Sequence, residues 1–380
     1  MMKKIAILGA TGSIGKQVLD VLGNDYQIVL LSAKQNGASL RDAFCHLNGV
    51  KIVSNCPYEV SAEDNNEHIF DTKILNDPNT YSNVDVVVNG IGGIWGIEPS
   101  FAVLESGAKL ITANKETFVA CGYLFMEKAK SLGKEVGVDI IPIDSEHSAV
   151  WQCLRGEDWS SLEKVTLTAS GGAFRDLSKE EISVLKASDA LNHPTWKMGK
   201  KVTVDSATLM NKGFEIIEAK HLFSCSNVDV VIHRESLIHS LVTFKDGCSK
   251  LQFSAPDMRL PISYALTEPG RAELDFGLKT PSLFDLANLS FARPDYEKFP
   301  LLKIAGYVSE IGSDYPSAVM CVADEVCVEL YLEDKISFYG ISDIISQTLE
   351  KFSMGKIENP TDVTSIYYGV REYILSIIGG

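Results

Sequence analysis

The sequence predicts an α/β protein with three parts: a doubly wound parallel sheet, a central α+β region with an open, partly antiparallel sheet, and a C-terminal α-helical bundle. The first part rests on short apolar runs that alternate with helical patterns over the first 140 residues. Strands that are apolar throughout and alternate with helices form parallel sheets covered on both faces. The runs are 3-KKIAILG, 27-QIVLLSA, 84-VDVVVNG, 108-AKLITAN and 138-VDIIPID.

The rest of the chain changes character. Between residues 141 and 270, one strand pattern precedes a predicted helix at 206–222 and three follow it, and Lys245-Asp246-Gly247 is typical of a hairpin turn. Residues 271–300 are irregular and predict a linker, and the helical spacing of residues 301–380 predicts the bundle. The predicted domains are therefore 1–140, 141–270 and 301–380. Residues 50–80 are polar and predict no clear element.

Composition excludes some classes of protein. The net charge of the 380 residues is −15, which argues against binding nucleic acid or an anionic membrane but not a small anion. The eight cysteines form no C-x-x-C pair and are expected to be reduced thiols of a cytoplasmic protein. No signal peptide and no apolar stretch of transmembrane length is expected.

A glycine-rich turn, 9-GATGSIG-15, follows the first predicted strand and opens a helix. In that position Gly9 permits a tight turn, Gly12 lets a pyrophosphate approach the backbone and Gly15 allows close packing, so a dinucleotide site is expected. The alternative is a turn that binds no ligand. The loop after the second strand has no acidic residue that could accept a hydrogen bond from a ribose 2′-hydroxyl. Lys34 of this loop could instead bind a 2′-phosphate, which favours NADP over NAD.

Two polar motifs follow later strands. Asn114, Lys115 and Glu116 stand where ligands of open parallel sheets bind, although an ordinary helix start explains them equally well. Asp144 and Glu146 are two residues apart, so on an extended segment both carboxylates face one side. Such a pair favours a cation, and oxygen ligands without Cys indicate Mg²⁺ or Mn²⁺. The alternative is a solvated helix N-terminus.

Of three further motifs, two suggest an anion site and one a lid. The turn at Ser170-Gly171-Gly172 could cradle a phosphate, or be only a turn. In 192-NHPTWKMG, Trp196 and Met198 either fill a core, which residue type alone favours, or cover a ligand.

In 204-VDSATLMNKGFEIIEA, the side chains of Asn211, Lys212 and Glu215 share a helix face. A surface Lys212–Glu215 pair is the plain interpretation, with Glu218 as further surface charge. The functional interpretation is a phosphate grip that includes Ser206, with Glu215 as a third carboxylate for the cation.

Six of these motifs, in the same order, resemble the 1-deoxy-D-xylulose 5-phosphate reductoisomerase family of the non-mevalonate isoprenoid pathway. They are GATGSIG, ANKE, DSEH, SGG, HPTWKMG and VDSATLMNKGFE, and the segments 256-PDMRLPI and 291-FARPDYEKFP extend the resemblance over nearly the whole chain.

The resemblance implies a homodimer that uses NADPH and one Mg²⁺ or Mn²⁺ per subunit to convert 1-deoxy-D-xylulose 5-phosphate. The metal ligands would be Asp144, Glu146 and Glu215. Substrate would meet Lys115, Ser145, Glu146, Ser170, His193, Trp196, Met198, Ser206, Asn211, Lys212 and Glu215, with Lys115, Glu146 and His193 as catalytic candidates. The cofactor would meet Thr11, Gly12, Ser13, Ile14, Lys34, Gln35, Asn36, Asn114, Glu116 and Gly199. Trp196 and Met198 would belong to a flap.

The chain also departs from the family pattern. The second cofactor loop, usually A-G-K-N-like, reads 33-AKQN, so its basic residue stands one position earlier. Residues 50–80 look shortened, an HPQS-like segment reads 233-HRES, and the Asn that usually precedes the C-terminal Ala-Asn-Glu is replaced around 321-CVADE. None of these departures touches the predicted metal or phosphate groups.

The family reaction rearranges the carbon skeleton by retro-aldol and aldol steps, and NADPH then reduces the resulting aldehyde. Two other interpretations compete with it. A semialdehyde or homoserine dehydrogenase also begins with a G-A-T-G-like turn, but the semialdehyde type needs a nucleophilic cysteine, and Cys121 and Cys153 lie in apolar helical runs. A non-catalytic NADP sensor would not need three carboxylates that converge beside a phosphate grip.

Overall fold

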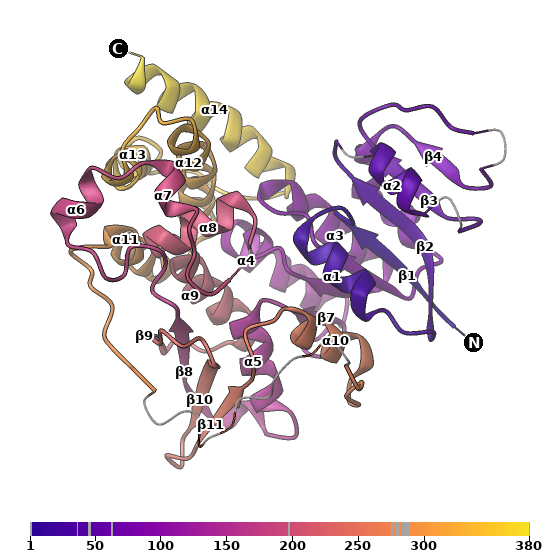
Figure 1. Ribbon diagram of the computed structural model, residues 1–380, viewed down its shortest axis with the longest axis horizontal. Helices are drawn as coiled ribbons and strands as arrows, with labels where there is room; N and C mark the ends of the chain where they lie inside the picture. Colours follow the sequence, from indigo (N-terminus) through magenta and orange to yellow (C-terminus); the bar gives the residue numbers. More distant parts are fainter. Residues whose placement is uncertain are drawn as a thin grey trace. The chain divides into compact units, whose positions relative to one another are not determined.

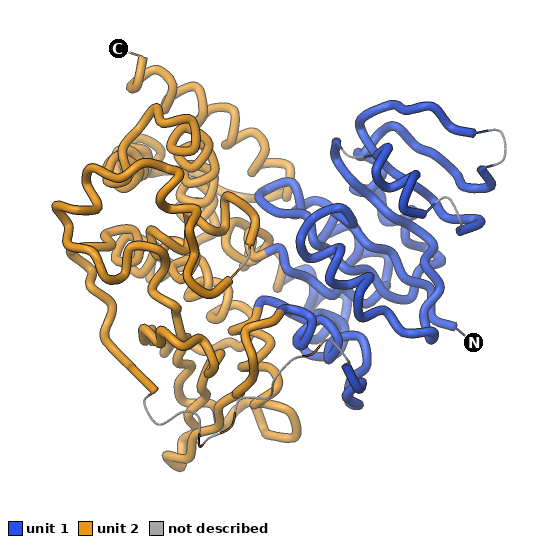
Figure 2. The backbone as a smooth tube through the Cα atoms, in the orientation of Figure 1, with its two compact units in different colours: residues 1–114, 127–144, 258–275 blue, residues 115–126, 145–257, 276–380 orange. Residues whose placement is uncertain are grey.

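The computed structural model describes residues 2–35, 37–44, 47–61, 64–196, 198–274, 277, 282, 284 and 289–379. The chain forms two compact units, drawn in two colours in Figure 2. Unit 1 comprises residues 1–114, 127–144 and 258–275, and unit 2 comprises residues 115–126, 145–257 and 276–380.

Unit 1 is built on a parallel sheet with the strand order β4-β3-β2-β1-β5-β6-β7 (Figure 1). Its central strands are buried, and β1 pairs in parallel with both β2 and β5. The doubly wound parallel sheet predicted from the apolar runs is confirmed. The strands are β1 (Lys3–Leu8), β2 (Tyr26–Ala33), β3 (Lys51–Ser54), β4 (Glu67–Ile69), β5 (Val86–Asn89), β6 (Lys109–Thr112) and β7 (Ile140–Pro142).

Helical elements connect these strands, and α10, which follows β11 in the chain, packs against α1. They are α1 (Ser13–Val21), α2 (Gly37–Phe44), η1 (Thr72–Asn76), η2 (Pro78–Tyr81), η3 (Ile94–Gly96), α3 (Ile97–Ser106), α4 (Glu116–Ser131) and α10 (Arg259–Thr267). Helix α4 has a kink at Cys121, and its residues belong partly to each unit.

Unit 2 contains a mixed sheet with the strand order β11-β10-β8-β9, where β10 pairs antiparallel with β8 and β11, and β8 pairs parallel with β9. The hairpin predicted around residue 246 is therefore the β10–β11 connection. Helices α5 and α9 pack on this sheet. The elements are α5 (Ser145–Leu154), η4 (Trp159–Ser161), β8 (Leu162–Ala169), α9 (Met210–Phe223), β9 (Val228–Ile232), β10 (Ile238–Phe244) and β11 (Ser249–Phe253).

The remaining helices of unit 2 include the predicted C-terminal bundle, in which the buried α12 packs against α11, α13 and α14. They are α6 (Lys179–Ser183), α7 (Ala187–Ala190), α8 (Lys200–Thr208), α11 (Pro300–Glu310), α12 (Asp314–Leu332), α13 (Phe338–Lys351) and α14 (Thr361–Ile378). Within the described ranges, each helix is too short or too polar to cross a membrane.

One predicted element differs from the structure, and one segment had no prediction. The helix predicted over 206–222 is interrupted at Leu209, whose φ of 62° separates α8 from α9. For the polar segment 50–80 no element was predicted; it contributes β3 and the edge strand β4 to the sheet.

Candidate active site

Three carboxylates meet where α5 and α9 approach each other. Asp144 directly precedes α5, Glu146 lies in its first turn, and Glu215 comes from α9. One ligand oxygen from each lies within 4.8 Å of the others. Glu215 is fully buried, whereas the other two are partly accessible. Three convergent carboxylates without a thiol form a site suited to a hard divalent cation.

Two buried lysines balance these carboxylates. The Lys212 Nζ lies 3.0 Å from Glu146 Oε1 and also donates to Glu215 Oε2. The Lys115 Nζ lies 3.6 Å from Glu215 Oε1. Lys212 and Glu215 are 4% and 0% exposed, so the interpretation as a surface ion pair is wrong. Buried charges persist only where they are paired, and each of these contacts supplies part of that pairing.

Neutral side chains complete the cluster. Lys115 donates to Asn211 Oδ1, and the Asn211 Nδ2 donates to Glu215 Oε1 at 2.5 Å. The Ser145 hydroxyl donates to Glu146 Oε2 at 2.6 Å. The polar face predicted on 211–215 is thus a hydrogen-bonded network that reaches Lys115, just before α4, and Glu146 of α5.

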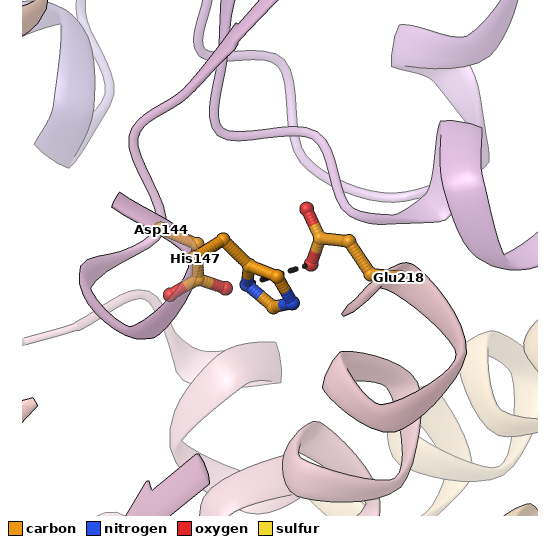
Figure 3. Close-up of side chains that lie close together, drawn as sticks. All are labelled: Asp144, His147 and Glu218. Atoms are coloured by element: carbon orange, nitrogen blue, oxygen red, sulfur yellow. Dashed lines mark ion pairs between the residues drawn. The ribbon is translucent and has the colours of Figure 1, made fainter. Parts of the chain in front are cut away.

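Behind the carboxylates lies a buried histidine–carboxylate pair (Figure 3). The His147 Nδ1 is 3.3 Å from Glu218 Oε2, and its Nε2 is 3.1 Å from the carbonyl oxygen of Glu215. A carbonyl oxygen only accepts hydrogen bonds, so the Nε2 of His147 carries a proton. His147 thereby holds the backbone of Glu215, one of the predicted metal ligands. Glu218 is 2% exposed, so its expected role as surface charge was wrong. Its position three residues after Glu215, on the same helix face, was the missed signal.

The turn after β8 carries an oriented hydroxyl. The His193 Nδ1 accepts from the backbone N–H groups of Thr195 and Trp196, at 3.1 and 2.8 Å, which leaves the ring proton on Nε2. That Nε2 lies 3.0 Å from Ser170 Oγ, which also accepts from Gly172 N at 3.3 Å. Both lone pairs of Ser170 are then used, and its O–H remains to donate to a ligand.

Burial, and then the charge of Arg175, lowers the pKa of His193 to about 4, so the ring is neutral at neutral pH. Arg175 was not predicted from the sequence. It donates to the carbonyl oxygen of Ser170 at 2.8 Å and holds the turn.

Gly172 places this turn against the end of α8. A Cβ at Gly172 would lie 2.4 Å from the carbonyl oxygen of Ser206, and its φ is 72°. Only glycine permits both the conformation and the approach. Two of the residues predicted to hold phosphate, Ser170 and Ser206, therefore lie on segments that touch.

The segment 192–199 connects this turn to α8. Trp196 and Met198 are both partly exposed, which leaves open whether they fill a core or cover a ligand. The Trp196 ring meets the edge of the buried His239, with centroids 5.9 Å apart. Gly199 is the exposed N-cap of α8.

The predicted dinucleotide turn lies between β1 and α1. Gly9 has a φ of 75°, and a Cβ on Gly15 would stand 2.4 Å from the Ala10 Cα, so both glycines are required by the backbone. Gly12 and Ser13 are exposed, and Thr11 and Ile14 are partly so. The free amide groups at the start of α1 thus remain open to an anion.

The other predicted cofactor residues of unit 1 follow neighbouring strands. Lys34 and Gln35 are exposed after β2, and Asn36 lies outside the described residues. Asn114 is buried, and its Nδ2 donates to the carbonyl oxygens of Ile91 and Gly93 at 2.9 and 2.8 Å. In unit 2, Glu116 is buried in the first turn of α4.

Known proteins share both the sequence and the fold. Family models described as 1-deoxy-D-xylulose 5-phosphate reductoisomerase, the C-terminal domain of that enzyme and the DXP reductoisomerase C-terminal domain match residues 5–122, 140–223 and 253–373. The chain is 43% identical to the 1-deoxy-D-xylulose 5-phosphate reductoisomerase of Persephonella marina over 387 aligned residues, which cover 99% of this chain and 98% of that protein. It is 40% identical to that of Clostridium kluyveri, with 98% of each chain covered.

The chain belongs to the 1-deoxy-D-xylulose 5-phosphate reductoisomerase family. Solved structures of this family agree over the full length of the chain. The reductoisomerase from Zymomonas mobilis in complex with NADPH matches with a TM-score of 0.89 at 32% identity, covering 100% of this chain and 99% of that one. A DOX-P reductoisomerase in complex with NADPH, fosmidomycin and magnesium matches equally well, with 98% of its chain covered.

Proposed function

We propose that the chain is a 1-deoxy-D-xylulose 5-phosphate reductoisomerase, which rearranges its substrate and reduces the product with NADPH to 2-C-methyl-D-erythritol 4-phosphate. The observation that carries the proposal is the cluster of Asp144, Glu146 and Glu215, with Lys115 and Lys212 among the carboxylates. Such a cluster suits a hydroxyketone, whose adjacent oxygens need a cation and proton donors at one place.

Asp144, Glu146 and Glu215 would hold one Mg²⁺ or Mn²⁺, since the donor set is entirely oxygen. A bound divalent ion withdraws electron density from the substrate's oxygens. The chain's own groups would do the rest near these oxygens. Lys115 and Ser145 would donate hydrogen bonds to them, and Glu146 and Lys115 are the candidates for proton transfer.

The opposite end of the substrate would bind through its phosphate. Ser170 would donate its remaining O–H, with His193 fixing that hydroxyl. Ser206, Asn211 and Lys212 would add donors from α8 and α9. In this structure Asn211 and Lys212 contact the carboxylates, so both would exchange these contacts for the phosphate when substrate binds. Binding energy from a non-reacting phosphate can be used for orientation and for closing a flap, here the segment with Trp196 and Met198.

The hydride would come from NADPH bound at the carboxyl edge of the unit 1 sheet. The glycine turn would receive the pyrophosphate through Thr11, Gly12, Ser13 and Ile14. Lys34, with Gln35 and Asn36, would face the ribose 2′-phosphate, and Asn114, Glu116 and Gly199 would add contacts.

A semialdehyde dehydrogenase is the weaker candidate. Burial raises the pKa of Cys153 to about 11 and, with the nearby Asp314, the pKa of Cys121 well above its ordinary value. A thiol with a raised pKa is a poor nucleophile. A pure NADP sensor would leave the carboxylate cluster without a use. The buried free cysteines favour a reducing compartment such as the cytoplasm.

The test is an assay of NADPH oxidation by the purified chain. Turnover is expected only when 1-deoxy-D-xylulose 5-phosphate and Mg²⁺ or Mn²⁺ are both present. Glu215→Gln should lower this turnover on the order of a hundredfold or more. The substitution removes the negative charge of a proposed metal ligand, and the same carboxylate also pairs with Lys115 and Lys212. Its NADPH affinity should stay close to that of the wild type.

Glu127→Gln, an exposed carboxylate of α4, is the matched control and should behave as wild type. Turnover that survives EDTA, or no turnover with this substrate, would contradict the proposed function.

A further inference from the structure

The cofactor loop after β2 makes an unusual contact. The Lys34 Nζ lies over the indole ring of Trp95, 4.6 Å from its centroid. The family pattern places the basic residue of this loop one position later. The ammonium group of Lys34 therefore needs a further contact if it is to occupy the position of that basic group. Trp95 lies in η3, after β5, and is 38% exposed although its neighbours Ile94 and Gly96 are buried.

The two partners stand on either side of the dinucleotide turn. Strand β1 pairs with both β2 and β5, so Lys34 after β2 and Trp95 after β5 flank the glycine turn that follows β1. The two outer strands are two interstrand spacings apart, about 10 Å. The two side chains bridge this separation at the carboxyl edge of the sheet, where dinucleotides bind.

The tryptophan is the fixed partner of the two. The Asn114 Nδ2 donates to the Ile91 and Gly93 carbonyl oxygens, and the Asn89 Nδ2 donates to that of Gly96 at 2.9 Å. A Cβ on Gly96 would lie 2.5 Å from the Asn114 side chain, so the loop is tightly packed. The backbone that carries Trp95 is therefore held in place by these contacts, whereas Lys34 is exposed and reaches toward the ring.

We propose that Trp95 is a positioning residue for the choice of cofactor: its ring holds the Lys34 ammonium at the mouth of the dinucleotide site, where the ammonium meets the ribose 2′-phosphate of NADPH. The inference rests on the proposed NADPH dependence. A cation over an indole face is attracted by the ring, and the ring leaves the outward side of the ammonium free to pair with an anion. NADH has no 2′-phosphate, so Trp95 should not matter for it.

Calorimetry on the full chain tests this with four ligands: NADPH, NADH, 2′,5′-ADP and 5′-AMP. In Trp95→Leu, the Kd for NADPH and 2′,5′-ADP should rise about two- to fivefold, the range of an exposed cation–π contact, with NADH and 5′-AMP unchanged. Trp95→Phe keeps a ring and should lose less. In a Lys34→Gln background, Trp95→Leu should add nothing, since the ring acts through the lysine.

Phe70→Leu is the matched control, because Phe70 lies in the same unit and is 40% exposed. Circular dichroism would verify that each variant folds. Equal weakening of NADPH and NADH in Trp95→Leu, no change in either, or an effect that persists without Lys34 would overturn the proposal. A wild-type chain that does not prefer NADPH to NADH would instead contradict the proposed cofactor, which separates the two failures.

Discussion

At the scale of single residues, His193 illustrates how a neutral ring can order a ligand site. Its Nδ1 accepts from two backbone amides of the segment 192–199, and its Nε2 faces Ser170. Only the neutral ring can accept at Nδ1. The lowered pKa of His193 and its two accepted hydrogen bonds therefore agree: the folded structure stabilises the neutral form of the ring.

The sign of the pH dependence follows. Because the folded pKa of His193 is about 4 and the ordinary value is 6.5, its contribution is complete above pH 6.5 and is lost as the pH falls towards 4. Tryptophan emission should change with a midpoint near pH 4, and Trp196→Phe would identify the share from Trp196. His193→Asn keeps an acceptor that does not titrate and should remove that transition. An unchanged transition in His193→Asn would contradict this prediction.

At the scale of elements, a buried charge network joins α8 to α12. The Lys201 Nζ lies 2.7 Å from both Asp205 Oδ2, on its own helix, and Asp324 Oδ2, on α12. Burial opposes the charge on Lys201, but these carboxylates and Glu325 hold its pKa well above the ordinary value. The network anchors the helix that follows segment 192–199 and carries Ser206.

This network contains more carboxylates than cations, and that excess predicts a pH effect on stability. Burial and nearby carboxylates raise the pKa of Glu325 from 4.5 to about 7, although Lys201 opposes the shift. A raised carboxyl pKa means that the folded state binds the proton more tightly, so stability falls as the pH rises from 4.5 to 7, by up to about 3 kcal/mol.

Glu325→Gln should remove that loss, making the variant more stable than wild type at pH 8 but not at pH 4. Urea unfolding at both pH values measures it. Glu350→Gln, an exposed carboxylate of α13, is the control and should keep the wild-type dependence. Identical pH profiles for wild type and Glu325→Gln would contradict the prediction.

Comparison of elements also shows what the sequence could predict. Continuous apolar runs identified five neighbouring strands of the first sheet, β2, β1, β5, β6 and β7, because burial on both faces requires such runs. The short strands β3 (KIVS) and β4 (EHI) carry too few apolar residues for that signal. The break between α8 and α9 at Leu209 could not be predicted from the sequence, since positive φ is rare for leucine and the residue type gives no indication of it.

For the candidate site, residue type and spacing on one element were informative. Asp144 and Glu146 stand out locally, and 211–215 share a helix face. Contacts between distant segments, such as Arg175 with Ser170 or Lys34 with Trp95, require the fold. The predicted domain boundaries at 140, 270 and 300 stay a prediction.

At the scale of the whole molecule, one face of the second sheet is a candidate for assembly. Helices α5 and α9 pack against the sheet (Figure 1). A cavity of about 710 Å³ lies against the sheet. It is lined by Lys164 and Thr166 of β8, Leu251 of β11 and residues of the segment 291–296. The rim includes large exposed hydrophobic side chains: Leu251, Phe291 and Tyr296 are 47%, 54% and 46% exposed. Contiguous exposed apolar surface of this kind marks interaction sites.

The homodimer expected from the family resemblance would use this face. Wild-type chain should then sediment at twice the chain mass of 41.6 kDa at micromolar concentration. Leu251→Lys and Phe291→Lys should shift the equilibrium towards monomer, since each places an unpaired charge in an apolar interface at a cost of several-fold or more in dimer affinity. Val184→Lys, at a site 78% exposed, is the control and should leave assembly unchanged. A monomeric wild type would refute the homodimer, whereas charge variants that remain dimeric would show that the interface lies on another surface.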